Sequence, residues 1–100
     1  MRRLCITVNG QSLSKSGDFK NLVRGSKGYL KTQFSFSSDW RGLKKVAIYQ
    51  NGETTKYEPI IRDMAAIPDE IAALNRFYVS VIGVNDETTI TTNKVNVEQR

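Results

Sequence analysis

The segment from Phe34 to Gln50, FSFSSDWRGLKKVAIYQ, constrains the fold more than any other part of this 100-residue chain. Apolar and polar residues alternate on both sides of a polar corner that holds the only tryptophan. Alternation with a period of two is typical of strands with one buried face. The segment therefore predicts two strands joined at a corner. The predicted core residues are Phe34, Phe36, Trp40, Val46 and Ile48, and the predicted outward residues are Lys31, Gln33, Lys45 and Tyr49.

The corner between these strands, SSDWRG, contains residues that favour a change of chain direction. Ser and Asp side chains bond nearby backbone N–H groups, and Gly42 permits a positive φ. We expect the ring of Trp40 to fold over the end of the core, with its indole N–H bonded to a partner. A tryptophan that lines a binding site is the alternative.

The N-terminal part of the chain predicts one strand and one long loop. Residues 4–8 alternate apolar and polar side chains, which predicts a half-buried strand that ends at Asn9-Gly10. Residues 11–28 mix Ser, Gly and Lys with isolated apolar residues, so we expect a long irregular loop. Loops of this length are uncommon within a compact domain and often carry function.

The dipeptide Asn51-Gly52 is the strongest short-range hairpin signal in the chain. A type I′ turn requires positive φ at both central positions, which Asn and Gly tolerate. The strand at 54–61 should therefore pair back on the strand at 44–50. Pro59 cannot donate to a strand ladder, so we expect it at an end or an edge.

The C-terminal part predicts a helix and two further strands. Pro68 suits the first turn of a short helix near 68–74. The alternation at 77–82 predicts a central strand, and the β-branched residues at 88–97 predict a closing strand. The predicted fold is all-β: one domain, residues 1–100, forming a small antiparallel β-sandwich, Ig-like or jelly-roll-like, with six to seven strands.

The net charge of +5 is concentrated in and around the predicted loop. Lysines there could neutralise phosphates while the rings of Phe19 and Tyr29 stack on bases, which makes nucleic-acid binding one hypothesis. Lysines that only solvate the surface are the default interpretation. The candidate interaction residues are Lys15, Lys20, Arg24, Lys27 and Lys31.

The residues that usually carry catalysis are scarce. The chain has no histidine and one cysteine, Cys5, which we expect to be a packing residue. The acidic pairs Asp69-Glu70 and Asp86-Glu87 flank a helix start and a turn, and RGSKG at 24–28 lacks the spacing of a phosphate loop. We therefore predict no catalytic residues, no metal and no cofactor, unless two carboxylates such as Asp39 and Glu70 converge in a cleft.

Four segments in a fixed order carry a resemblance to a known family. They are FSFSSDWRGLKKVAIYQNG, AAIPDEIAAL, FYVSVIGVND and TTITTNKVNV. In this order they resemble a family of small phage and prophage structural proteins of Gram-positive hosts. The likeness covers roughly residues 29–97, and the loop at 11–28 lies outside it. The resemblance implies a β-sandwich module of a virion fibre, tail or baseplate protein, either standing alone or as the N-terminal part of a longer chain.

The resemblance sets the functional expectation. The first hypothesis is a non-enzymatic virion module that self-associates, in a cyclic arrangement, and docks to other virion proteins through its sheet edges and basic loop. Such a protein would reside in the virion, and in the host cytoplasm during assembly, with no membrane partner. The alternative is a prophage-encoded protein that binds nucleic acid or a host factor through the basic loop. An enzyme is the third hypothesis.

Overall fold

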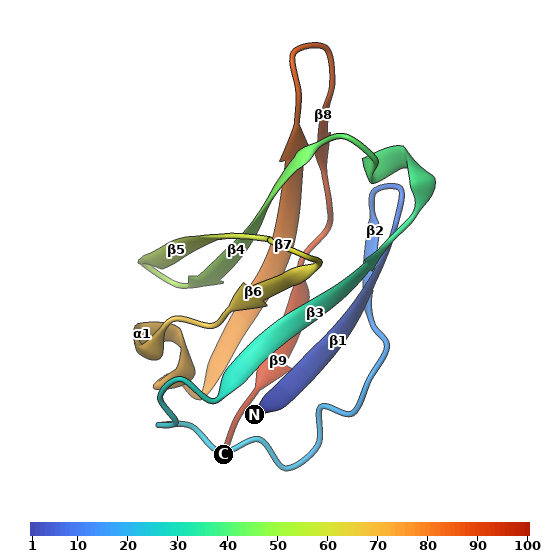
Figure 1. The fold of residues 1–100 in the computed structure, drawn as a ribbon. Helices are drawn as coiled ribbons and strands as arrows, with labels where there is room; N and C mark the ends of the chain where they lie inside the picture. The colour runs from blue at the N-terminus through green and yellow to red at the C-terminus, as the bar shows by residue number, and fades with distance from the viewer.

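A computed structural model describes residues 1–100, which form nine strands in two packed sheets (Figure 1). The N-terminal sheet has the strand order β2-β1-β3-β6, and the C-terminal sheet has the order β5-β4-β7-β8, with β9 also paired to β7. The prediction of a small all-β sandwich is confirmed, with nine strands in place of the six to seven that the sequence predicts. The strands are β1 (Arg2–Asn9), β2 (Ser12–Lys15), β3 (Leu30–Phe36), β4 (Lys44–Asn51), β5 (Thr54–Pro59), β6 (Met64–Ala66), β7 (Arg76–Val84), β8 (Thr89–Thr91) and β9 (Val95–Glu98).

The predicted loop at 11–28 begins with a strand. Asn9 pairs with Ser12 across a two-residue turn, and β2 runs back along β1. Gly10 has a φ of 58° in this turn, and Leu13 is buried between the sheets. The irregular segment is therefore residues 16–29. It returns the chain to β3, which pairs with β1 in parallel. The sequence predicts antiparallel pairing throughout, so this part of the prediction is wrong.

The hairpin between β4 and β5 forms as predicted, but its turn is shifted by one residue. Asn51 pairs with Thr54, which leaves Gly52 and Glu53 as the central residues. Only Gly52 has a positive φ, 54°, so the type I′ prediction is wrong. A glycine at the first central position is typical of type II′ turns. Pro59 ends β5 at the edge of the sheet, as expected.

β7 is central, as predicted, but the closing strand is interrupted. β8 pairs with the C-terminal part of β7, and β9 pairs with its N-terminal part. Between them the hydroxyl of Thr92 accepts a hydrogen bond from the Val81 N–H at 2.9 Å. The next residue, Asn93, turns toward β2, where its side-chain amide bonds both the N–H and the C=O of Leu13. One asparagine thus joins the two sheets along this side.

Two short helical turns accompany the strands. The predicted helix near 68–74 is a single turn, α1 (Asp69–Ala72), with Pro68 directly before it. The corner at 38–40 forms a 3-10 turn, η1 (Ser38–Trp40). Neither turn is long enough to form a layer, so the core lies between the two sheets.

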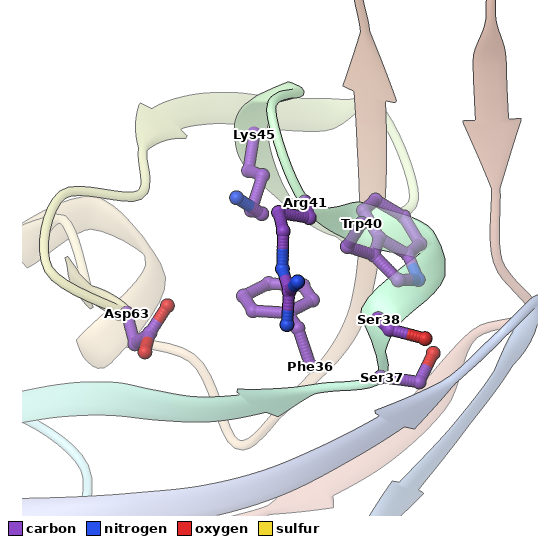
Figure 2. Close-up of a pocket in the computed structure, with 7 residues that line it drawn as sticks. All are labelled: Phe36, Ser37, Ser38, Trp40, Arg41, Lys45 and Asp63. Atoms are coloured by element: carbon purple, nitrogen blue, oxygen red, sulfur yellow. The ribbon is translucent and has the colours of Figure 1, made fainter.

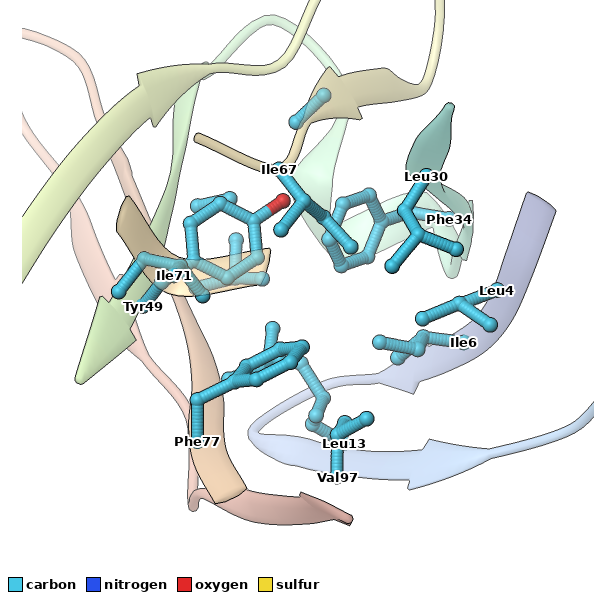
Figure 3. Close-up of a cluster of buried hydrophobic side chains, with 14 of the residues drawn as sticks. Leu4, Ile6, Leu13, Leu30, Phe34, Tyr49, Ile67, Ile71, Phe77 and Val97 are labelled. Atoms are coloured by element: carbon cyan, nitrogen blue, oxygen red, sulfur yellow. The ribbon is translucent and has the colours of Figure 1, made fainter. Parts of the chain in front are cut away.

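Side chains from both sheets meet in one hydrophobic cluster (Figure 3). Phe34 is buried as predicted, and Phe36 is half-buried against it with ring centroids 5.6 Å apart. On the side of the C-terminal sheet, Tyr49 packs edge-on to Phe77, with ring centroids 6.1 Å apart. The other large, fully buried side chains are Trp40, Leu4, Ile6, Ile71, Val8, Val79, Val81 and Val97.

The parity predicted for β4 is wrong. Ala47 and Tyr49 are fully buried, whereas Val46 and Ile48 point to the other face of the sheet and are only half-buried. β4 carries apolar residues on both faces, so alternation alone could not tell which face meets the core. Lys45 points inward with Tyr49, and its ammonium lies over the ring of Phe36 at 5.3 Å. The aliphatic stem of a lysine can cover apolar surface in this way.

The prediction for Trp40 is confirmed. Its side chain is fully buried, and its indole N–H donates to the Gly10 carbonyl at 2.8 Å. The six-membered ring lies directly on Gly83 of β7, where a Cβ atom would stand 2.6 Å from Cζ3 of the indole. The tryptophan therefore fixes the β1–β2 turn and β7 to the same corner.

A buried tyrosine hydroxyl links the two sheets in the middle of the core. The Tyr49 hydroxyl and the Thr32 hydroxyl lie 2.7 Å apart, and Thr32 also donates to the Ala65 carbonyl at 3.2 Å. Burial raises the pKa of Tyr49 well above its usual 10.0; the bond to Thr32 opposes this shift and the nearby Glu58 carboxylate adds to it. The fold therefore holds this phenol in its neutral form.

Gly83→Ala should destabilise the protein by about 1–3 kcal/mol, because the added methyl overpacks against the Trp40 ring. Urea unfolding followed by the fluorescence of the single tryptophan measures this change. Ser35→Ala, at an exposed strand position, is the control and should leave the midpoint almost unchanged. Equal midpoints for both variants would contradict the close contact.

Stability should fall as the pH rises above 10, because the unfolded tyrosine ionises there while folded Tyr49 stays protonated. Each pH unit above 10 then lowers the free energy of unfolding by about 1.4 kcal/mol. Tyr49→Phe removes this titration, so its loss of stability between pH 9 and pH 11 should be smaller than that of the unmodified protein. Urea midpoints of both proteins at the two pH values test this, and parallel losses would disprove it.

Candidate interaction surfaces

The five basic residues predicted as an interaction site do not form one patch. Lys15 lies on β2, where its ammonium donates to the Asn96 carbonyl at 2.9 Å and lies 5.4 Å from the ring centroid of Phe19. Lys31 lies on the outward side of β3, next to Arg3 of β1. The other three, Lys20, Arg24 and Lys27, are exposed along the segment 16–29.

The segment 16–29 follows a defined path around one end of the sandwich (Figure 1). The Arg2 guanidinium donates to the carbonyls of Asp18, Lys20 and Asn21, at 3.2, 2.5 and 3.4 Å. Leu22 is buried, and its carbonyl accepts from the N–H of Arg100 at 2.8 Å. The role of Arg2 in holding this segment is not apparent from the sequence.

The start of the segment also explains how Cys5 is placed. The N–H groups of Ser16 and Gly17 both donate to the Cys5 carbonyl, at 3.0 and 3.3 Å. A Cβ on Gly17 would stand 2.9 Å from the Cβ of Cys5, so only glycine fits this crossing without a shift. Cys5 is half-buried beneath it, which agrees with a packing role.

Positive charge is nevertheless unevenly distributed. Residues 1–38 hold seven Lys or Arg and one acid, Asp18, whereas residues 39–100 hold eight basic and nine acidic residues. Both ion pairs, Lys56–Glu70 and Arg76–Glu98, lie in the second group. The excess positive charge therefore belongs to β1–β3 and the segment 16–29, where no side chain forms an ion pair.

A pocket of about 370 Å³ opens beside the Trp40 corner (Figure 2). Phe36 and Trp40 supply its apolar part, and Arg41, Lys45 and Asp63 line it with Ser37 and Ser38. Asp63 reaches the pocket from a two-residue turn in which Arg62 and Asp63 both have positive φ, 54° and 63°. The Asp63 carbonyl accepts from the Phe34 N–H at 2.8 Å, which ties this turn to β3.

The chemistry available in this pocket is limited. The hydroxyl of Ser37 accepts from the Gly10 N–H at 2.9 Å and has no histidine beside it to act as a base. Asp39 lies near Ser37, whereas Glu70 pairs with Lys56 at 3.3 Å, so these two carboxylates do not converge. Nowhere in the chain do three or more His, Cys, Asp or Glu side chains gather in a group that could hold a metal ion.

A third surface, missed by the sequence reasoning, is the outward side of the C-terminal sheet. We call it the outer face. It contains side chains that share one parity across β5, β4 and β7, and Tyr57, Tyr78 and Val84 are 64%, 38% and 42% exposed. Between its charged corners the face carries uncharged residues. They are Val46, Ile48, Tyr57, Pro59, Tyr78, Ser80, Ile82 and Val84.

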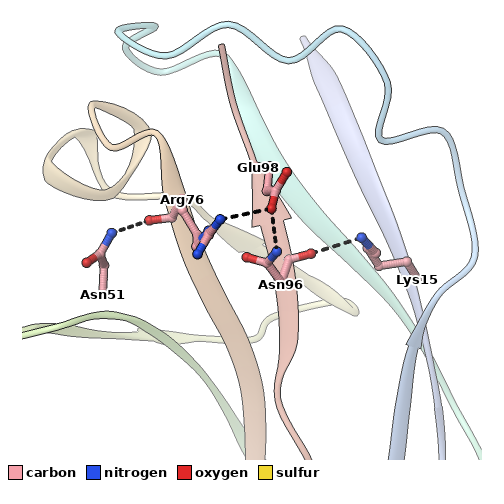
Figure 4. A network of polar contacts seen from close by, with 5 residues as sticks. All are labelled: Lys15, Asn51, Arg76, Asn96 and Glu98. Carbon is pink, nitrogen blue, oxygen red and sulfur yellow. Dashed lines mark hydrogen bonds and ion pairs between the residues drawn. The ribbon is translucent and has the colours of Figure 1, made fainter.

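Charged residues mark two ends of the outer face. Lys44 pairs with Val84 at one end of β7, and Arg76 pairs with Glu98 at the other. There the Arg76 guanidinium binds Glu98 Oε1 at 3.2 Å, and the Asn96 amide donates to the same oxygen at 3.0 Å (Figure 4). The apolar surface thus lies between two charged ends.

The sheet edges are less open than the sequence suggested. Asn93 and Lys15 close the edge of β2 against the β8–β9 side. β5 remains an edge strand, but Pro59 removes one of its N–H donors. The outer face is therefore the larger uncovered apolar feature.

No protein-family model and no curated protein matches this chain. None of its helices is long and apolar enough to cross a lipid bilayer.

Arg2→Ala should release the segment 16–29 and speed tryptic cleavage after Lys20 and Arg24 by about tenfold, because three hydrogen bonds to its backbone are lost. Limited proteolysis followed by mass spectrometry measures the two cleavage rates. Arg3→Ala is the matched control, since the Arg3 guanidinium contacts only the Gln33 side chain. Equal rates in the two variants would show that Arg2 does not anchor the segment.

Proposed function

We propose that this chain is a non-enzymatic structural module of a phage virion, which associates with other virion proteins and with itself. The observation that carries the proposal is the outer face, which exposes Tyr57 and Tyr78 among uncharged residues. Monomeric proteins rarely expose large contiguous apolar surfaces, and those that do commonly use them for binding. Tyrosine is also enriched among the residues that contribute most to binding energy.

The arrangement of the rest of the molecule supports a role in assembly. Trp40 and Tyr49 fix the sandwich from within, and the segment 16–29 is held by Arg2, so the module presents its surfaces on a rigid frame. Ser37 accepts a hydrogen bond from Gly10 and has no histidine beside it, and Glu70 pairs with Lys56 rather than with Asp39. On this proposal the protein resides in the virion and passes through the host cytoplasm during assembly.

A second candidate function rests on the charge distribution. The seven basic residues of positions 1–38 make no ion pair, and most are exposed, so they could neutralise phosphates of a nucleic acid or acidic groups of a host factor. Binding of this kind weakens steeply as salt rises. A steep salt dependence of affinity for DNA or RNA would favour this second function.

The proposal predicts that the protein is a component of purified virions. An antibody against the chain should detect it in gradient-purified phage particles, and the signal should survive nuclease treatment. Tyr57→Asp, which places a charge at the most exposed tyrosine of the outer face, should lower incorporation at least about tenfold. Lys27→Glu, on the exposed segment 16–29, is the control and should incorporate normally. A protein found only outside the particles would disprove the proposal.

A further inference from the structure

The register of the C-terminal sheet places opposite charges at diagonal corners of the outer face. β7 lies between β4 and β9. Lys44 of β4 is level with Val84, and Glu98 of β9 is level with Arg76. Ser80 is four residues from each of these two levels. The midpoint between Lys44 and Glu98 therefore falls at Ser80, in the middle of the central strand.

We propose that a second copy of this chain covers the outer face, related by a twofold axis that passes through the sheet-to-sheet interface at Ser80. This inference rests on the self-association in the proposed function and adds its surface and symmetry. A twofold axis at a midpoint exchanges the two corners. Lys44 of each copy then meets Glu98 of the other, so one dimer contains two such ion pairs.

The centre of the face suits a close approach of two sheets. Ser80 is small and only 7% exposed, because its neighbours on the face already surround it. Val46 and Ile82 lie level with each other on one side of Ser80, and Gln50 and Tyr78 on the other. The twofold brings Val46 of one copy onto Tyr78 of the second copy, which buries apolar surface on both.

The geometry agrees with known sheet packing. With strands about 4.8 Å apart and residues about 3.4 Å apart, the axis that exchanges Lys44 and Glu98 crosses the strands of the two copies at about 40° from antiparallel. Aligned sheets in β-sandwiches cross at about 30°. The charge pattern therefore requires a crossing angle of similar size to that of aligned sheets.

The charged groups at both corners have capacity for a new partner. Lys44 is exposed and makes no ion pair. Glu98 accepts both of its hydrogen bonds at Oε1, which leaves Oε2 for the second copy. In the other twofold arrangement, with strands parallel, the Lys44 side chains would lie at the same end of the interface and repel each other. Like charges in that position select against the parallel dimer.

Other occupants fit the face less well. A nucleic acid needs several cations on the surface it covers, whereas the outer face offers Lys44 and an arginine already paired to Glu98. A partner with a charged surface would desolvate those charges against the uncharged centre at a cost in binding free energy. A second copy brings a surface that matches in both polarity and charge.

A charge exchange tests the proposed dimer. Sedimentation equilibrium should show the unmodified protein as a dimer, and Lys44→Glu should raise its dissociation constant about tenfold because two ion pairs become repulsive. The double variant Lys44→Glu/Glu98→Lys should return the constant to within about threefold of the original value. Lys31→Glu is the matched control, because it makes the same change on the outward side of the N-terminal sheet, and it should leave the dimer intact.

Three results would overturn the inference: a monomer at all concentrations, equal effects of Lys44→Glu and Lys31→Glu, or no recovery in the double variant. Circular dichroism checks that each variant is folded. If the double variant does not fold, Tyr78→Glu alone should give a monomer, and a persisting dimer would then reject the interface. A protein that is monomeric yet present in virions would reject the dimer and the self-association, and would leave the role as a virion component standing.

Discussion

The burial of Trp40 is the interaction on which the rest of the structure depends. Its indole N–H bonds the Gly10 carbonyl at 2.8 Å, and its ring rests on Gly83. These two contacts connect the β1–β2 turn of one sheet to the central strand of the other. In a 100-residue chain, where the core is small relative to the surface, one large side chain that reaches both sheets has a correspondingly large share in their packing.

Hydrogen bonds between the sheets add to the apolar packing of the core. Asn93 bonds the backbone of Leu13, Lys15 bonds the Asn96 carbonyl, and Thr32 bonds Tyr49 in the interior. Each of them requires a particular register of the strands, because a one-residue slip would turn the side chain to the other face. Apolar packing drives the sheets together, and these bonds then select one alignment.

Much of the fold follows from alternation in the sequence, and the errors have physical causes. The burial of Phe34 follows from alternation because β3 has one apolar face, and the burial of Trp40 follows from its place in the polar corner after that strand. Val46 and Ile48 were misplaced because β4 is apolar on both faces, and the inward Lys45 hides the true parity. The sequence pattern predicts a loop in place of β2 because this strand is only four residues long and exposes three of them.

The candidate surfaces were harder to predict than the fold. Counting charges identified an excess of lysine, but it could not show that Lys15 and Lys31 would lie on different strands with different neighbours. No pattern in the sequence indicates that Arg2 binds three backbone carbonyls. The outer face depends on the register of β4, β5 and β7, which brings together residues from distant parts of the sequence.

The apolar residues on both faces of β4 explain why its parity was predicted wrongly, and they also support the proposed dimer. A strand with one face in water usually carries polar residues on that face, yet β4 carries Val46 and Ile48 there. The neighbouring positions on β5 and β7 are Pro59, Tyr57 and Ile82, so the apolar character extends across three strands. Apolar residues on both faces are typical of strands covered on both sides. The core covers one side of β4, and a second copy related by the twofold at Ser80 would cover the other.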